Sequence, residues 1–257
     1  MLCSIQQLDG FQLAASDGVI GHARELYFDD EQWVVRHVVA DTGGWLSVRK
    51  VLISPHAIVR IDAARRQLDV ALSRRQIQDA PGIDTDRPVT RQQEIPYYDH
   101  YGYPYYWAGS GLWGVEALPQ AGEPLLGSQR GAGLPDEVAE AIAVAERAAA
   151  DGHLRSSAEV IGYDVEASDG AIGHIADFLF DDRSWQIRYA VVDTRHWLPG
   201  RRVLVPPRSI INMDWNKRRA HFQLTRATVE ASPPYRHGTA PTREYEASVQ
   251  RHYEGWL

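Results

Sequence analysis

An internal repeat limits what this 257-residue chain can fold into. Residues 16–22 (Ser-Asp-Gly-Val-Ile-Gly-His) and residues 168–174 (Ser-Asp-Gly-Ala-Ile-Gly-His) differ at one position and lie 152 residues apart. The same offset pairs Phe28-Asp29-Asp30 with Phe180-Asp181-Asp182, Trp33 with Trp185, and His100-Tyr101 with His252-Tyr253. The repeated unit is therefore about 95 residues long, which is the size of one small domain and too long for a solenoid repeat.

Each copy has the sequence pattern of a small antiparallel β-fold. In the first copy, residues 19–28 alternate between two faces, and residues 29–32 supply turn chemistry before the β-branched run at residues 33–41. Further short strands are expected at residues 45–53, 59–61 and 68–71. Strands at this spacing predict a small barrel or sandwich. Trp33 and Trp185 begin the most apolar strand of each copy, so we expect them to be equivalent core or near-core residues.

A helical tail is expected after each β-domain. In the second copy the apolar face of this helix consists of Tyr245, Val249, Tyr253 and Trp256. In the first copy Pro96 lies inside the equivalent helix, where proline costs about 3 kcal/mol, so we expect the two tails to differ. Both tails carry more apolar surface than a barrel of about 70 residues covers. We therefore expect at least one tail to reach the opposite barrel.

The repeat divides the chain into three parts. Residues 1–103 form the first copy with its tail, and residues 160–257 form the second copy with its tail. Residues 104–159 between them are rich in aromatic residues and glycine, which is typical of a linker. Within this linker, residues 135–150 are rich in alanine and have one narrow apolar stripe, which predicts a helix.

The motifs of both copies resemble those of one protein family. Asp-Gly-x-Ile-Gly-His, Phe-Asp-Asp-x-x-Trp and Arg-x-x-Val-x-Asp-Thr occur in the same order in each copy. This combination resembles the PRC-barrel family, which is known from the photosynthetic reaction-centre H subunit and from ribosome-maturation factors. The resemblance implies a mainly β protein with two tandem small antiparallel β-barrels, packed as a pseudo-two-fold pair, and with short terminal and linker helices. It implies a binding or assembly role, and it carries over no catalytic or cofactor residue.

Charge, cysteine content and the length of the apolar runs limit the kind of binding partner and the location that we expect for this protein. The chain has 27 Lys and Arg against 34 Asp and Glu, a net charge of −7 and a pI of about 5.8, which disfavours binding to a phosphate backbone. The single cysteine, Cys3, cannot form an intrachain disulfide and suits a reducing compartment. No apolar run reaches the roughly 18 residues of a membrane-spanning helix. We therefore expect a cytoplasmic protein without a membrane span.

The ionisable residues that recur in both copies do not form a catalytic or metal-binding pattern. His22, His174 and the aspartate pairs at residues 29–30 and 181–182 lack the accompanying ligands that a metal site needs. The aspartates adjoin predicted turns, where their usual role is to bond the backbone. Arg36 and Arg188 are expected to pair with a carboxylate, with Asp41 and Asp193 as candidates. We expect no catalytic residue, no metal and no cofactor.

Gly21 and Gly173 occupy equivalent positions on a predicted strand. Glycine inside a strand is typical of a bulge or of a corner where a barrel bends. We therefore expect a structural role for both residues.

One aromatic run is the strongest candidate for an interaction surface. It consists of Tyr97, Tyr98, Tyr101, Tyr103, Tyr105, Tyr106 and Trp107. Aromatic residues are enriched in protein interfaces, so a partner-binding surface is one interpretation. The alternative is packing within the chain across the two barrels. Stacking on single-stranded nucleic acid is disfavoured because no basic groove accompanies the run.

These observations predict a non-enzymatic binding or scaffold protein with an unidentified protein partner. Two alternatives remain open at this point. One is an enzyme or small-ligand protein that uses the cleft between the barrels. The other is a ribosome-assembly factor, which a continuous basic face would favour. Besides an intrachain pseudo-dimer, the chain could assemble into a further homo-oligomer.

Overall fold

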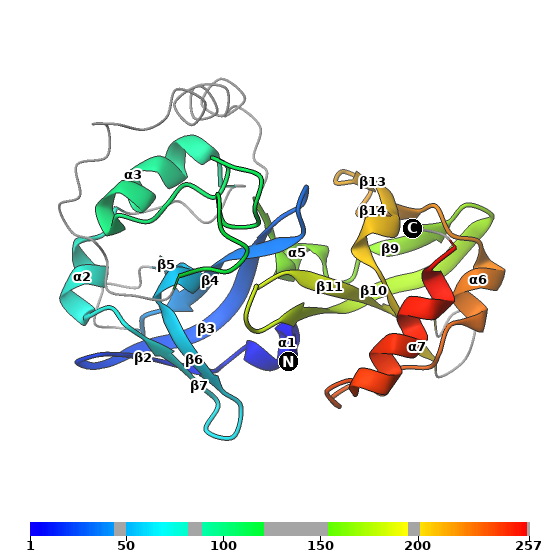
Figure 1. The fold of residues 1–257 in the computed structure, drawn as a ribbon, viewed down its shortest axis with the longest axis horizontal. Helices are drawn as coiled ribbons and strands as arrows, with labels where there is room; N and C mark the ends of the chain where they lie inside the picture. The colour runs from blue at the N-terminus through cyan, green and yellow to red at the C-terminus, as the bar shows by residue number, and fades with distance from the viewer. Residues whose placement is uncertain (44–49, 82–88, 121–153, 195–200, 256–257) are drawn as a thin grey trace. The chain divides into compact units, whose positions relative to one another are not determined.

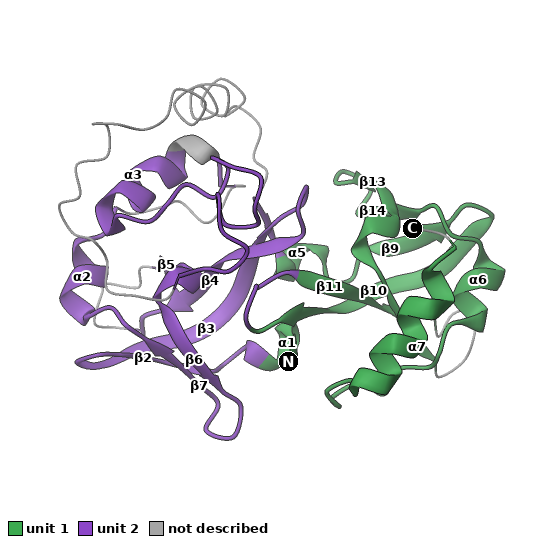
Figure 2. Cartoon of the chain, viewed as in Figure 1, with its two compact units in different colours: residues 1–7, 157–182, 187–257 green, residues 8–156, 183–186 purple. Residues whose placement is uncertain are grey.

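The computed structural model describes residues 1–43, 50–81, 89–120, 154–194 and 201–255 (Figure 1). They form two compact units, shown in Figure 2. Unit 1 contains residues 1–7, 157–182 and 187–257, and unit 2 contains residues 8–156 and 183–186. The units thus interleave along the chain, unlike the sequential domains expected from the repeat. The predicted helix at residues 135–150 lies outside the described residues, as do Trp45 and Trp256.

Unit 2 is built on one seven-stranded sheet with the order β5-β4-β3-β2-β7-β6, in which β8 also pairs with β3. Its strands are β2 (Gln12–Ala15), β3 (Gly18–Asp29), β4 (Val34–Asp41), β5 (Lys50–Ile53), β6 (Ile58–Asp62), β7 (Gln67–Val70) and β8 (Leu154–Ser156). Its helices are η2 (Pro55–Ala57), α2 (Arg74–Asp79) and α3 (Arg91–Tyr101).

Unit 1 is built on a second seven-stranded sheet with the order β12-β11-β10-β9-β14-β13, in which β1 also pairs with β10. Its strands are β1 (Leu2–Ser4), β9 (Asp164–Ala167), β10 (Gly170–Asp181), β11 (Ile187–Asp193), β12 (Arg202–Val205), β13 (Ile210–Asp214) and β14 (Arg219–Phe222). Its helices are α5 (Ser157–Val160), η3 (Pro207–Ser209), α6 (Arg226–Ala231) and α7 (Arg243–Tyr253), and α1 (Ile5–Leu8) begins in this unit.

The prediction of a mainly β protein with short helices is confirmed, and the two sheets have the same strand order. Most pairings are antiparallel, as expected, but β2 pairs in parallel with β7, and β9 pairs in parallel with β14. The strand order of each sheet is an open path. Among the described residues no pairing joins β5 to β6 or β12 to β13, so the expected closed barrels are not seen.

Two equivalent short strands pair with the sheet of the other copy. In unit 1, β1 lies antiparallel to β10, with Ser4 opposite Leu179. In unit 2, β8 lies antiparallel to β3, with Ser156 opposite Tyr27. β8 lies in the segment predicted as a linker, but it matches β1 at the offset of 152 and so belongs to the second copy. Each sheet is therefore assembled from segments of both copies.

The helical tails contact their own units. Tyr97 in α3 bonds the backbone of Leu52, and His252 in α7 bonds the backbone of Thr228. That a tail also reaches the opposite β-domain stays a prediction. The exchange between the copies is made by the short strands β1 and β8, because a three-residue strand can form ladder hydrogen bonds with little apolar surface of its own.

The two tail helices also have the same length, in contrast to the expected difference. Both α3 and α7 contain 11 residues, and α3 continues through Pro96. Each helix begins after a capping threonine, Thr90 or Thr242. Proline removes one backbone donor, but Tyr97 and Tyr98 beyond it are buried, and this packing outweighs the local cost.

Asp29 ends β3 and organises the hairpin turn to β4, as expected for an aspartate beside a turn. Its Oδ1 accepts hydrogen bonds from the backbone N–H groups of Glu31 and Gln32, at 2.9 and 3.1 Å. Trp33 closes the turn with a left-handed φ of 56°, and Trp185 has the equivalent φ of 60°. Their burial differs, however, because Trp33 is half-buried whereas Trp185 is 2% exposed. The two tryptophans are therefore equivalent in backbone conformation and unequal in burial.

Gly21 and Gly173 allow two backbones to approach closely. A Cβ atom at either position would lie 2.0 or 1.9 Å from the carbonyl oxygen of Asp41 or Asp193. Next to each glycine the strand register shifts, between Leu13 and Ala14 in unit 2 and between Ala171 and Gly173 in unit 1. The expectation of a bulge at these glycines is confirmed.

No helix among the described residues is long and apolar enough to cross a membrane.

Candidate functional site

Residues 103–116, here called the strap, follow α3 and fold onto the sheet of unit 2. Five tyrosine rings are buried in this region, namely Tyr97, Tyr98 and Tyr101 of α3 and Tyr103 and Tyr106 of the strap. Tyr105 and Trp107 are half-buried, and their ring centroids stack at 4.9 Å. The five buried rings cannot form the exposed interaction surface expected from the sequence. They pack within the chain, as the alternative held, but on their own unit.

Arg36 of β4 is the centre of the contact between strap and sheet. Its guanidinium is fully buried, pairs with Asp29 at 3.2 Å and donates to the carbonyl oxygen of Leu112 in the strap at 2.5 Å. The rings of Tyr106 and Trp113 lie 3.8 and 4.9 Å from the same cation. A buried charge is costly unless it is paired, so the strap carbonyl and rings complete the environment that Arg36 requires.

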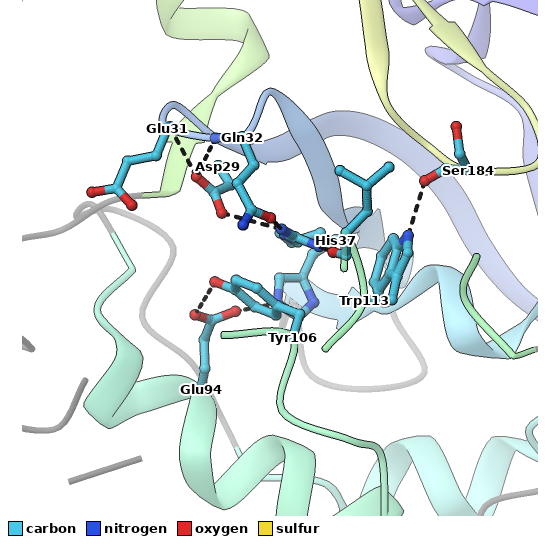
Figure 3. A network of polar contacts seen from close by, with 10 residues as sticks. Asp29, Glu31, Gln32, His37, Glu94, Tyr106, Trp113 and Ser184 are labelled. Carbon is cyan, nitrogen blue, oxygen red and sulfur yellow. Dashed lines mark hydrogen bonds and ion pairs between the residues drawn. The ribbon is translucent and has the colours of Figure 1, made fainter. Parts of the chain in front are cut away.

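A second set of buried polar contacts joins His37, the next residue in β4, to the strap. His37 Nε2 lies 2.9 Å from Glu94 Oε1, and the Tyr106 hydroxyl donates to Glu94 Oε2 at 2.8 Å (Figure 3). Burial raises the pKa of Tyr106, and the nearby Glu94 carboxylate raises it further. The phenol therefore stays protonated and serves as a donor to Glu94.

The far end of the strap is held by Trp113. Its indole Nε1 donates to the carbonyl oxygen of Ser184 at 2.9 Å, and its ring meets His56 edge-on at 4.9 Å. His56 also stacks on Tyr103 at 4.9 Å. The strap is thus fixed at Tyr103, Tyr106 and Trp113, all of which are buried.

The strap explains why strand β4 is buried on both of its faces. The seven residues from Val34 to Ala40 in β4 are all buried, so both faces of the strand are covered. The equivalent strand β11 has Arg188 exposed at its second position. The sequences are similar, and the difference in burial lies on the face that the strap occupies in unit 2.

The five positions under the strap have counterparts 152 residues later. They are Arg188 for Arg36, Tyr189 for His37, Arg208 for His56, Glu246 for Glu94, and Gln250 for Tyr98. Whereas all five are buried in unit 2, Arg188, Arg208 and Gln250 are exposed in unit 1, and Glu246 is half-buried. We call these five residues of unit 1 the open face.

The open face is one continuous site. Burial raises the pKa of Tyr189, Glu246 raises it further, and Arg188 and Arg208 lower it. Gln250 hydrogen-bonds the same tyrosine. The four other residues of the open face therefore all act on Tyr189, which is itself buried. The exposed guanidinium groups of Arg188 and Arg208 give the face its cationic character.

The other residues singled out in the sequence do not converge on this face. His22 is exposed and His174 is half-buried, and among the described residues no group of three or more His, Cys, Asp and Glu side chains could hold a metal ion. Asp41 pairs with Arg24 at 3.2 Å and Asp193 with Arg202 at 2.9 Å. The partner of Arg36 is therefore Asp29, and the expected pairing with Asp41 or Asp193 is wrong.

Cavities of about 430 and 230 Å³ also lie in unit 1. The larger one is lined in part by Glu166 and Arg219, which form an ion pair at 2.7 Å. The smaller one is lined in part by Tyr235 and Tyr245, whose hydroxyls donate to backbone carbonyl oxygens at 3.2 and 3.0 Å. These polar groups are engaged within the unit.

The sequence contained a signal for the open face that local motifs did not reveal. Arg36 and Arg188 stood out as repeated residues, but Glu94 and Glu246 did not, because a glutamate near the start of a helix is ordinarily a solvent-facing residue. The signal is the constant offset of 152, which places Arg188 and Glu246 at the positions of Arg36 and Glu94.

A comparison with protein families adds the identity of the second copy. The family model of the PRC-barrel domain matches residues 153–219. The matched range extends from β8 to the first residue of β14 and includes Arg188 and Arg208 of the open face. No curated protein matches the chain.

Proposed function

We propose that this chain, whose residues 153–219 match the PRC-barrel domain, is a non-enzymatic binding module of the cytoplasm. Its partner is a protein, which docks on the open face of unit 1 around Arg188. The observation that supports this proposal is the difference between the two units, since one sheet face is covered by the strap and its counterpart is open.

The chemistry of the open face suits protein binding. Interfaces combine a desolvated centre with a polar rim, and arginine and tyrosine are enriched at their energetically important positions. The open face has buried Tyr189 at its centre and exposed Arg188 and Arg208 around it. Arginine also tolerates desolvation when a partner supplies carboxylate or carbonyl oxygens in a planar arrangement.

Site-specific photo-crosslinking in the native cell tests this function. The substitution Gln250→p-benzoylphenylalanine places the crosslinker on the open face and keeps both of its arginines, and the same substitution at Arg75 serves as the matched control. Arg75 lies in α2 of unit 2, and its side chain is 89% exposed. We expect a defined protein adduct from position 250 that position 75 does not give.

A second variant tests the charge of the face. Arg208→Glu in the crosslinking protein should abolish the adduct at position 250, because it reverses one of the two exposed cations. Arg75→Glu should leave that adduct unchanged. Identical adducts from positions 250 and 75, or no protein adduct from position 250, would overturn the proposed function.

A further inference from the structure

We propose that the open face of unit 1 binds an aromatic segment of the partner protein in the way that unit 2 binds its own strap. This inference rests on the proposed function and specifies the chemistry of the partner. The segment carries a tyrosine and a tryptophan and presents a backbone carbonyl oxygen between them. The strap of unit 2 is the template, because it shows which groups satisfy this kind of sheet face.

The two side chains that hold the strap are retained in the open face. Arg36 binds the Leu112 carbonyl oxygen and faces the rings of Tyr106 and Trp113, and its counterpart is Arg188. Glu94 accepts the Tyr106 hydroxyl, and its counterpart is Glu246. The open face therefore keeps both the cation that a carbonyl and aromatic rings satisfy and the carboxylate that a phenol satisfies.

The remaining differences adapt the face to a separate segment. Arg208 replaces His56, which stacks on Tyr103 and meets Trp113 edge-on in unit 2. A guanidinium at this position can stack on an aromatic ring and can also pair with a carboxylate. Because Arg188 and Arg208 outnumber Glu246 on the face, charge complementarity favours a segment that also has an acidic residue.

The burial of Tyr189 gives a further reason to expect an occupant. Tyr189 is only 2% exposed although its neighbours Arg188 and Gln250 are exposed, so the centre of the face is already shielded from solvent. A segment that covers Arg188 would strengthen each polar contact by excluding water.

The natural probe is a synthetic peptide with the sequence of residues 103–116, labelled with a fluorophore. Its affinity for the full-length protein is measured by fluorescence anisotropy, together with the variants Arg188→Ala and Glu246→Gln. Arg75→Ala is the control. Circular dichroism and thermal melting confirm that each variant is folded.

We expect saturable binding with one peptide per chain. Arg188→Ala should weaken it by about tenfold or more, as for the loss of a charge-assisted hydrogen bond and two cation–π contacts. A peptide in which phenylalanine replaces the tyrosine equivalent to Tyr106 should bind roughly threefold to tenfold more weakly to the wild-type protein. This penalty should shrink for Glu246→Gln, because the phenol and the carboxylate act as a pair.

Three results would overturn the inference. The first is an absence of peptide binding to folded protein. The second is binding that Arg188→Ala and Arg75→Ala weaken equally. The third is a concentration-dependent dimer, detected by sedimentation, that Arg188→Ala dissociates while the peptide has no effect, since a second copy would then occupy the face. If the crosslink at position 250 persists in any of these cases, the proposed function stands and only the aromatic chemistry fails.

Discussion

The hydroxyl of Ser4 donates a 2.5 Å hydrogen bond to the carboxylate of Asp177, although 173 residues separate the two in the chain. Asp177 is fully buried in β10 and also accepts the backbone N–H of Gln6 at 3.1 Å. This contact fixes β1 to the sheet of unit 1. The equivalent contact in unit 2 joins Ser156 of β8 to Glu25 of β3, so a serine anchors the exchanged strand in both units.

Ser4→Ala should loosen β1 in unit 1. The variant leaves a buried carboxylate short of one donor, which costs about 1 to 3 kcal/mol. Cys3 lies on β1 and is the single cysteine of the chain, so its reaction with a thiol reagent reports release of this strand. Burial raises the pKa of Cys3 to about 11, so the native thiol reacts slowly. We expect Ser4→Ala to increase the reaction rate by roughly fivefold or more.

Ser156→Ala is the matched control, because it removes the equivalent donor from unit 2. It should leave the Cys3 rate within about twofold of wild type, since the two contacts share no partner. If both variants accelerate Cys3 equally, or if neither does, the assignment of β1 to the unit 1 sheet is wrong.

Asp177 should make the stability of unit 1 depend on pH in an unusual direction. Burial raises the pKa of Asp177 above its ordinary value, more than the hydrogen bonds from Ser4, Gln6 and Phe178 lower it. Between the unfolded and folded pKa values the folded state holds the proton and the unfolded state does not. The contribution of Asp177 is therefore fully present below the unfolded pKa and is lost as the pH rises through the folded pKa.

The substitution Asp177→Asn tests this direction of the change in stability with pH. The amide keeps an oxygen acceptor and cannot ionise, so the variant lacks this loss of stability. Chemical denaturation from about pH 3 to about pH 7 should show the free energy of unfolding of the variant improving relative to wild type as the pH rises. A difference between the two proteins that is constant with pH, or that moves the other way, would refute the assignment.

Gly21→Ala and Gly173→Ala should both be strongly destabilising. The new Cβ atom would overlap the carbonyl oxygen of Asp41 or Asp193, and backbone atoms cannot yield as a flexible side chain can. Overpacking of this kind costs about 1 to 3 kcal/mol or more. Gly255→Ala is the control, because nothing lies within 4 Å of its Cβ position. Equal unfolding midpoints for all three variants would contradict the close approach of the strands.

The two equivalent tryptophans should differ on truncation. Trp185→Ala should cost about 3 to 5 kcal/mol, because its side chain is 2% exposed, whereas Trp33→Ala should cost clearly less. Trp33 is half-buried and stacks on Phe28 at 5.4 Å. Urea denaturation of both variants measures the difference. Equal losses would mean that the two hairpins have the same environment.

The sequence predicted the local structure well because its signals are local. The turn at Asp29 and the bulge at Gly21 each follow from residues within a few positions. The strand exchange could not be predicted in this way. Leu2 and Ser4 do match Leu154 and Ser156 at the offset of 152, so the strands themselves were recognisable. However, Ser4 could meet Glu25 or Asp177 equally well, because the two sheets are nearly equivalent in sequence.

The strap was hidden for a different physical reason. Tyr97 of α3 and Tyr106 of the strap carry hydroxyl groups that suit a surface as well as an interior, and composition alone does not show that Leu52 and Glu94 accept their hydrogen bonds. The presence of Pro96 led to a wrong prediction for the helix, because the sequence shows the local cost of proline but not the tertiary packing that offsets this cost. Burial of the rings beyond it reverses the balance.

Arginine labelling gives the most direct test of the difference between the two sheet faces. The native protein is treated with phenylglyoxal, and the modification rates of Arg36 and Arg188 are read by mass spectrometry. Arg188 should react at the rate of an exposed arginine such as Arg75, and Arg36 should react about 100-fold or more slowly, because labelling requires local opening of the strap. Similar rates at Arg36 and Arg188 would contradict the account, because one face would then be as open as the other.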